Sequence, residues 1–134
     1  MELKYKRILL KLSGEALAGE KKSGFDEAVI ASICGGIRKA HDQGVQIGIV
    51  VGGGNFWRGR SSGKMDRMDA DKIGMLATVM NALAVKDALR QQGVPAVVMT
   101  SAVMPQVAET FTSDKAIAAL EAGTIVVFGG GTGN

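Results

Sequence analysis

The chain has 134 residues, a hydrophobic content of 46% and a net charge of +3, which together suit one globular domain. The charge is mild and accompanies no dense basic stripe or known nucleic-acid module, so we expect no nucleic-acid partner. No apolar stretch is long enough to span a bilayer, no signal peptide opens the chain, and no metal-ligand spacing occurs around the single cysteine, Cys34. We therefore expect a cytoplasmic protein with a buried thiol, no protein-bound metal site and no membrane partner.

Short apolar runs alternate along the chain with segments whose apolar residues recur at helical spacing. The run at 7–12 (RILLKL) is typical of a buried strand, and Asp26 is a suitable N-cap for the first helix. Gly44 and Gly93 stand where the first two helices should end. The predicted elements, in chain order, are a strand at 7–12, a loop at 13–24, a helix at 26–43, a strand at 45–51, a loop at 52–69, a helix at 70–92, a strand at 94–99, a helix at 114–122 and a strand at 124–128.

Strands that alternate with helices predict parallel pairing through crossover connections, and near-continuous apolar strands predict helices on both faces of the sheet. The expected fold class is therefore α/β with a mostly parallel sheet. Ligands of such sheets bind beyond the carboxyl ends of the strands. Three chemically suggestive loops follow strands here, at Ser13-Gly14, 52–55 and 129–134. Their common position predicts a single binding cleft.

The second of these loops reads Gly52-Gly53-Gly54-Asn55. Glycines after a strand let backbone N–H groups approach an anion without obstruction by side chains. The spacing does not fit a dinucleotide fingerprint, because Trp57 stands where its third glycine is needed. It does not fit a Walker A loop either, since the Gly-Lys pair continues to Met65. A tight turn without a ligand remains the alternative interpretation.

Lys11 and Arg58 are the basic residues nearest to these loops. A lysine in an apolar strand is unfavourable to bury unless its ammonium group reaches a polar site, although an exposed lysine on an edge strand is equally compatible with the pattern. Arginine suits phosphate because its planar guanidinium group grips two oxygens. Arg58 also lies in a loop of mixed charge, which is often simply solvated.

Asp71 lies near the start of the predicted helix at 70–92. It could cap that helix or interact favourably with its dipole. It could equally accept hydrogen bonds from ribose hydroxyl groups, as acidic residues do in other nucleotide sites. The glycine-rich stretch at 129–134 repeats the pattern of a strand followed by glycines, and its position at the end of the sequence predicts a partial chain.

Four motifs occur in order and at suitable separations, namely Lys11-Leu12-Ser13-Gly14-Glu15-Ala16-Leu17, Gly52-Gly53-Gly54-Asn55 with Arg58-Gly59, Asp71 with Gly74-Met75-Leu76-Ala77-Thr78, and Gly131-Thr132-Gly133-Asn134. Together they closely resemble bacterial-type UMP kinases (uridylate kinases) of the amino acid kinase family, over essentially the whole chain. The resemblance implies an incomplete amino acid kinase (carbamate kinase-like) fold. Residues 1–134 would be the N-terminal UMP-binding portion, and the C-terminal ATP-binding half would be absent.

The implied activity is reversible phosphoryl transfer from ATP to UMP, which gives ADP and UDP in pyrimidine nucleotide biosynthesis. The resemblance implies catalytic roles for Lys11 and Arg58, and ATP contacts by Lys11, Leu12, Ser13, Gly14, Gly54 and Arg58. It implies UMP contacts by Gly53, Asp71, Thr132, Gly133 and Asn134. A GTP-responsive region would comprise Gly19, Glu20, Lys21, Lys22, Ser23 and Gly24.

The resemblance also implies Mg²⁺ supplied with ATP, activation by GTP, inhibition by UTP and a homohexamer for the full-length protein. Two other classes of function stay open at this point. One is a catalytically inactive fragment that binds uridine nucleotides. The other is a dinucleotide-binding oxidoreductase domain, which shares the alternating strands but not the glycine spacing.

Overall fold

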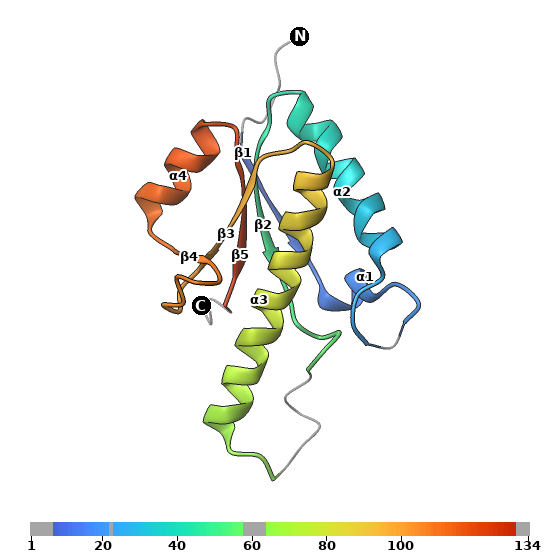
Figure 1. Ribbon diagram of the computed structural model, residues 1–134, viewed down its shortest axis with the longest axis vertical. Helices are drawn as coiled ribbons and strands as arrows, with labels where there is room; N and C mark the ends of the chain where they lie inside the picture. Colours follow the sequence, from blue (N-terminus) through green and yellow to red (C-terminus); the bar gives the residue numbers. More distant parts are fainter. Residues whose placement is uncertain (1–6, 22, 58–63, 131–134) are drawn as a thin grey trace.

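The computed structural model describes residues 7–21, 23–57 and 64–130, and within them the chain forms a five-stranded sheet in the order β1-β2-β5-β3-β4 (Figure 1). The strands are β1 (Arg7–Leu12), β2 (Gln46–Val51), β3 (Ala96–Thr100), β4 (Glu109–Thr110) and β5 (Ile125–Gly129). The helices are α1 (Gly14–Ala18), α2 (Glu27–Asp42), α3 (Arg67–Gln91) and α4 (Ser113–Glu121). All of the strand pairs in this part of the chain are parallel, which confirms the predicted α/β class.

Strand β5 is the last strand along the described chain, yet it lies in the middle of the sheet, between β2 and β3. Its residues Ile125, Val126 and Val127 are fully buried, as expected of a central strand covered on both faces. The parallel register pairs β1 with β2 and β2 with β5, so the carboxyl ends of these three strands lie side by side. The loops that follow them are therefore neighbours.

Helices cover both faces of the sheet, as the sequence predicts. Helices α1, α2 and α3 pack on one face over the main core, and α4 packs on the other face over a smaller cluster. Cys34 lies in the main core, fully buried, with its Sγ 3.9 Å from the carbonyl oxygen of Val85. The prediction of a buried thiol is confirmed, and burial raises the pKa of Cys34 to about 11.

The segment predicted as a loop at 13–24 contains helix α1, so that prediction was wrong for its first part. Ser13 caps this helix by accepting a hydrogen bond from the Ala16 nitrogen at 3.1 Å, and Leu17 anchors it in the core. Strand β4 was not predicted, because two residues carry no periodic signal. Helix α3 begins at Arg67 rather than at residue 70, since Asp66 caps it by accepting from the Asp69 nitrogen at 3.2 Å.

Candidate functional site

The loops after β1 and β2 meet at the carboxyl edge of the sheet, the lower end of the sheet in Figure 1. The Gly52 nitrogen donates a hydrogen bond of 2.9 Å to the Leu12 carbonyl oxygen, which joins the two strand ends. A Cβ atom at Gly14 would lie only 2.6 Å from the Gly54 nitrogen and 2.5 Å from the Asn55 Oδ1. No side chain fits at that position, so the Ser13-Gly14 turn and the 52–55 turn are in direct backbone contact.

Strand β1 is an outer strand of the described sheet, and its residues alternate between exposed and half-buried, so the prediction of a buried strand at 7–12 was wrong. Lys11 lies on its exposed side. It lines a hollow of about 580 Å³ together with Leu12, Ser13 and Gly52. Lys11 is thus an exposed lysine on an outer strand, and it also lines a hollow in which a ligand could bind. The two interpretations of Lys11 offered by the sequence are therefore compatible. Ser13 is engaged as the acceptor of the α1 cap, but its hydroxyl hydrogen remains available to donate.

The 52–55 turn is shaped by close contacts at each of its glycines. The Gly53 carbonyl oxygen accepts hydrogen bonds from the Phe56 and Trp57 nitrogens, both at 3.0 Å. A Cβ atom at Gly53 would lie 2.9 Å from the Ala77 Cβ on α3, and one at Gly54 would lie 2.7 Å from both carboxylate oxygens of Glu15. Tight packing thus explains the glycines whether or not an anion binds the turn.

Two buried amide side chains hold this turn from within. Asn55 and Asn81 are 2% and 0% exposed, and they exchange hydrogen bonds of 2.9 and 2.7 Å. Asn81 also donates to the Gly52 carbonyl oxygen at 2.6 Å, and Asn55 donates to the Gly24 carbonyl oxygen at 2.9 Å. Sequence reasoning missed Asn81, because α3 carries many polar residues and nothing in its sequence separates this amide from the solvent-facing ones.

The third glycine turn, after β5, is also attached to α3. The Thr78 Oγ1 accepts a hydrogen bond of 2.7 Å from the Gly130 nitrogen and donates one of 2.6 Å to the Met75 carbonyl oxygen. A Cβ atom at Gly129 would lie 3.1 Å from the Val79 Cα. In the sequence Thr78 is recognisable only as the last residue of the motif at 74–78, because its hydrogen bond joins positions that are 52 residues apart.

Asp71 is exposed on the amino-terminal part of α3, which extends beyond the sheet in Figure 1. It is not the helix cap, because α3 begins at Arg67 and Asp66 supplies the cap. It stands one helical turn before Gly74, whose carbonyl oxygen would lie 3.3 Å from a Cβ at Gly53. The structure therefore places Asp71 about one turn of helix from the glycine loop, with its carboxylate in solvent.

The segment at 19–24 docks on the 52–55 turn. Gly19 ends α1 with a φ of 60°, and the exposed side chains of Glu20, Lys21 and Ser23 follow. The Gly24 nitrogen then donates a hydrogen bond of 3.1 Å to the Asn55 carbonyl oxygen. The predicted site residues that lie outside the described part of the chain are Lys22, Arg58, Thr132, Gly133 and Asn134.

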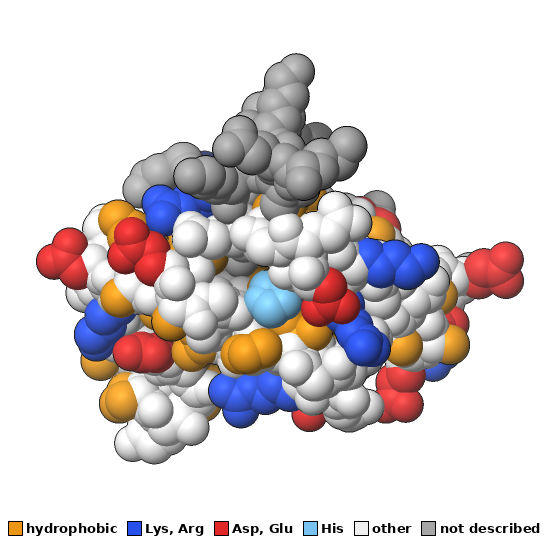
Figure 2. Space-filling view, turned by 90° about the horizontal axis from the view of Figure 1, so that it is seen from above, with side chains coloured by type: hydrophobic (Ala, Val, Ile, Leu, Met, Phe, Trp, Pro, Cys, Tyr) orange, Lys and Arg blue, Asp and Glu red, His pale blue; other side chains and the backbone are white. Residues whose placement is uncertain are grey.

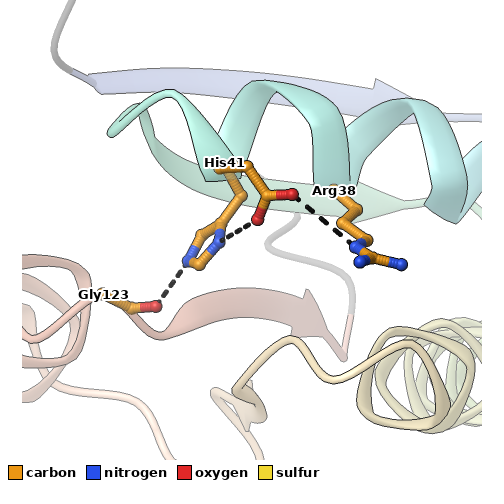
Figure 3. Close-up of polar contacts among 4 residues, drawn as sticks. Arg38, His41 and Gly123 are labelled. Atoms are coloured by element: carbon orange, nitrogen blue, oxygen red, sulfur yellow. Dashed lines mark hydrogen bonds and ion pairs between the residues drawn. The ribbon is translucent and has the colours of Figure 1, made fainter.

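The single histidine lies at the opposite edge of the sheet, where the strands begin, and Figure 2 shows it among interspersed acidic, basic and apolar side chains. The His41 Nε2 lies 2.7 Å from the Gly123 carbonyl oxygen, and its Nδ1 lies 4.0 Å from the Asp42 carboxylate (Figure 3). A carbonyl oxygen only accepts, so Nε2 carries the hydrogen in this contact. His41 thus links α2 to the turn between α4 and β5, far from the glycine loops.

Within residues 7–21, 23–57 and 64–130, no three His, Cys, Asp or Glu side chains gather in a way that would hold a metal ion. In the same ranges, no helix combines the length and apolar character needed to cross a membrane.

Uridylate kinases of two bacteria are similar to this chain over nearly its full length. The enzymes of Pediococcus pentosaceus and Limosilactobacillus reuteri are both 53% identical to it over 135 residues, which cover 99% of this chain and 56% of each relative. The chain therefore spans about half the length of the curated relatives it matches.

Solved structures show the same fold. The UMP kinase of Bacillus anthracis superposes with a TM-score of 0.90 at 39% identity, covering 97% of this chain and 55% of that one. The UMP kinase of Ureaplasma parvum gives 0.88 at 32% identity, with 97% and 58% coverage. The aspartate kinase of Synechocystis gives 0.65 at 15% identity, covering 90% and 21%, which supports the shared fold alone. The sequence model named Amino acid kinase family matches residues 6–134, and the chain belongs to that family.

Proposed function

We propose that this chain forms the UMP-binding portion of a UMP kinase, which transfers a phosphoryl group reversibly from ATP to UMP and gives ADP and UDP. The observation that carries the proposal is the contact between the Ser13-Gly14 turn and the 52–55 turn beside Lys11. The uridylate kinase relatives support the same activity, which belongs to pyrimidine nucleotide biosynthesis. The ATP-binding half would correspond to the part of those relatives that this chain does not span.

Lys11 is the proposed charge-stabilising residue of the transfer. Phosphoryl transfer depends on positioning of the reactants and on neutralisation of charge on the migrating group, rather than on covalent chemistry by the protein. Lys11 lines the hollow and is exposed, so its ammonium group could meet a phosphate there without burial of an unpaired charge. Arg58 would assist it, and Leu12, Ser13, Gly14 and Gly54 would contribute the remaining ATP contacts.

UMP would lie along the 52–55 turn toward α3. Gly53 would let the ligand approach the backbone, and Asp71 would accept hydrogen bonds from the ribose hydroxyl groups. The position of Asp71 near the glycine turn, exposed and free of a capping role, supports this assignment. The stretch from Thr132 to Asn134 would complete the UMP contacts.

Mg²⁺ would reach this site bound to ATP. The described residues contain no acidic cluster that would hold it alone, and Mg²⁺ in kinases is commonly held through substrate phosphates with one or two carboxylates. Bound in this way, it would supply further neutralisation of phosphate charge. Lys11 and the backbone of the two turns would orient the nucleotide around it.

Regulation and assembly extend the proposal to the full-length protein. The region at 19–24 would respond to GTP as activator, because Gly24 is hydrogen-bonded to Asn55 and so touches the proposed phosphate turn directly. Inhibition by UTP, a homohexamer and a cytoplasmic location complete the same proposal. They are carried by the resemblance to UMP kinases.

A second candidate is a uridine-nucleotide-binding fragment without catalytic activity. The chain spans 56% of the length of each uridylate kinase relative, so nucleotide binding and catalysis by this chain are tested separately. The dinucleotide-binding oxidoreductase alternative has no support, since the similar proteins are kinases and the glycine spacing does not fit.

Thermal denaturation in the presence of UMP, UTP, ATP with Mg²⁺, and NAD tests the proposal. A ligand at a hundred times its dissociation constant adds about 2.7 kcal/mol to stability, which raises the midpoint by several degrees, at roughly 2–8 °C per kcal/mol. We expect stabilisation by UMP or UTP and none by NAD. Phosphorylation of UMP by the same preparation separates the kinase from the inactive fragment, and stabilisation by NAD alone would overturn both.

A further inference from the structure

The amide pair of Asn55 and Asn81 uses its full donor capacity in four hydrogen bonds. Each side chain has two N–H hydrogens. Asn81 gives one to Asn55 and one to the Gly52 carbonyl oxygen, while Asn55 gives one to Asn81 and one to the Gly24 carbonyl oxygen. Both amide oxygens accept a bond from the partner amide. The network is closed, and each of its outward bonds ends on a backbone oxygen of a glycine.

An apolar pair would be expected at these positions if packing were the only requirement. The neighbouring buried residues of α3, such as Ala82 and Val85, are apolar. Burial of two amides is favourable only when all their polar atoms are paired. The arrangement therefore points to what the amides hold in place, which is the backbone on either side of them.

The 52–54 segment has no side chains with which to fix its own position. Glycine has the greatest backbone freedom of any residue, so three in succession need restraint from outside. Gly52 is held on one side by its nitrogen, bonded to the Leu12 carbonyl oxygen, and on the other by its carbonyl oxygen, bonded to Asn81. The first bond ties the turn to β1 and the second ties it to α3.

The same pair extends to the segment at 19–24. Asn55 contacts Gly24 twice, through its side-chain nitrogen at 2.9 Å and through its own carbonyl oxygen, which accepts from the Gly24 nitrogen at 3.1 Å. The rings of Phe25 and Phe56, one residue beyond each partner, meet edge to face with centroids 5.2 Å apart. The segment and the turn are therefore joined over three successive contacts.

We propose that Asn81 is a positioning residue for the glycine turn, and that the Asn55–Asn81 pair joins α3, the turn and the segment at 19–24 into one unit. Asn81 does not touch the nucleotide; it sets the backbone that does. Only the expected effect on nucleotide affinity rests on the proposed function. The structural claim, that loss of the Asn81 side chain frees Gly52 and Gly24 selectively, stands independently.

The test compares Asn81→Ala with Val85→Ala, which removes another fully buried side chain from α3 one turn further along without touching either glycine. Backbone amide hydrogen exchange is followed for Gly24 and Gly52, with Val127 in β5 as the internal reference. In Asn81→Ala, the Gly52 carbonyl oxygen and the Asn55 amide lose their Asn81 partner, so the turn and Gly24 should open more often. Exchange at the two glycine amides, which keep their own acceptors, should then quicken about tenfold or more relative to Val127. In Val85→Ala, the three amides should change in parallel.

The affinities for UMP and for ATP with Mg²⁺ are then measured per folded molecule, well below the unfolding midpoint. We expect at least one affinity to fall about tenfold in Asn81→Ala and neither to fall in Val85→Ala. Asn81→Thr nearly keeps the side-chain volume and retains one hydrogen-bond donor, so its exchange rates and affinities should lie between those of the unsubstituted chain and Asn81→Ala. It replaces the alanine variant if that variant does not fold.

If the Gly24, Gly52 and Val127 amides changed their exchange rates by the same factor in Asn81→Ala, as they should in Val85→Ala, the structural claim would be overturned. Selective exchange with unchanged affinities would overturn the positioning role. If the unsubstituted chain bound neither nucleotide, the proposed function would fail for this chain, while the exchange data would still decide whether Asn81 fixes the turn.

Discussion

Substitution of Gly53 by alanine should destabilise the protein by forcing a new side chain against helix α3. The new Cβ would lie 2.9 Å from the Ala77 Cβ, 3.3 Å from the Gly74 carbonyl oxygen and 3.4 Å from the Thr78 nitrogen, all on α3. Carbon atoms pack best at about 3.5–4.0 Å. The backbone of a packed helix cannot rotate out of the way as a side chain can. Overpacking of this kind costs about 1–3 kcal/mol.

Gly36→Ala is the matched control, because it makes the same change of residue but should raise the free energy of unfolding instead of lowering it. Gly36 lies inside α2, and a Cβ there would meet nothing within 4 Å. Alanine should therefore stabilise the helix by about 0.5–1 kcal/mol through its better helix propensity. Urea denaturation followed by circular dichroism measures both changes on the same scale, and the slope with denaturant should stay constant.

A second substitution identifies the contact responsible. Ala77→Gly removes the nearest atom, so the double variant should be less destabilised than the sum of the single variants, with a coupling energy of about 0.5–3 kcal/mol. Additive effects, or a neutral Gly53→Ala, would refute the packing of the 52–55 turn against α3. Destabilisation by Gly36→Ala would show that the steric reading of the glycines is unsound in general.

Three further outcomes are expected. In a preparation that phosphorylates UMP, Lys11→Ala should lower kcat about a hundredfold or more while circular dichroism stays unchanged, because the exposed side chain supports charge stabilisation and not the core. Asp71→Ala should raise KM for UMP and leave that for ATP unaltered, and an unchanged UMP dependence would remove Asp71 from the site. Burial raises the pKa of Cys34 from 9.0 to about 11, so the contribution of its neutral thiol to stability is fully present below pH 9 and is lost as pH rises toward 11. Denaturation of Cys34→Ala beside the unsubstituted chain across this range isolates that loss, and iodoacetamide should label the folded thiol slowly at pH 7.

The sequence predicts those parts of the fold that have a local cause. The apolar run at 7–12 and the cap at Asp26 both correspond to observed elements, since the Asp26 carboxylate accepts from the Ala28 and Val29 nitrogens at 3.0 and 3.2 Å. Helix α1 escapes detection because five residues are too few for a 3.6-residue period to show. The glycine-rich sequence around it also favours a loop interpretation.

Features that depend on distant partners are not accessible from the sequence in the same way. Asn81 reads as an ordinary polar residue until Asn55, 26 positions earlier, is known to face it. Glu15 reads as part of a motif until its carboxylate is found against Gly54. The placement of β5 between β2 and β3, with α3 and α4 packed against it, is likewise a set of contacts between distant segments that no local pattern encodes.

Helix α3 explains why glycines follow two neighbouring strands. A Cβ at Gly53 would meet Ala77, and a Cβ at Gly129 would meet Val79 at 3.1 Å and Ala82 at 3.2 Å, so one stretch of helix presses on both strand ends. The anion-binding and tight-turn interpretations of such glycines are therefore not exclusive. The absence of side chains lets the helix approach at Gly53 and Gly129, and a turn that binds an anion would use the backbone N–H groups of the same kind of glycine-rich loop. Glycine spacing alone cannot separate the two requirements, whereas paired substitutions on the helix and on the turn can.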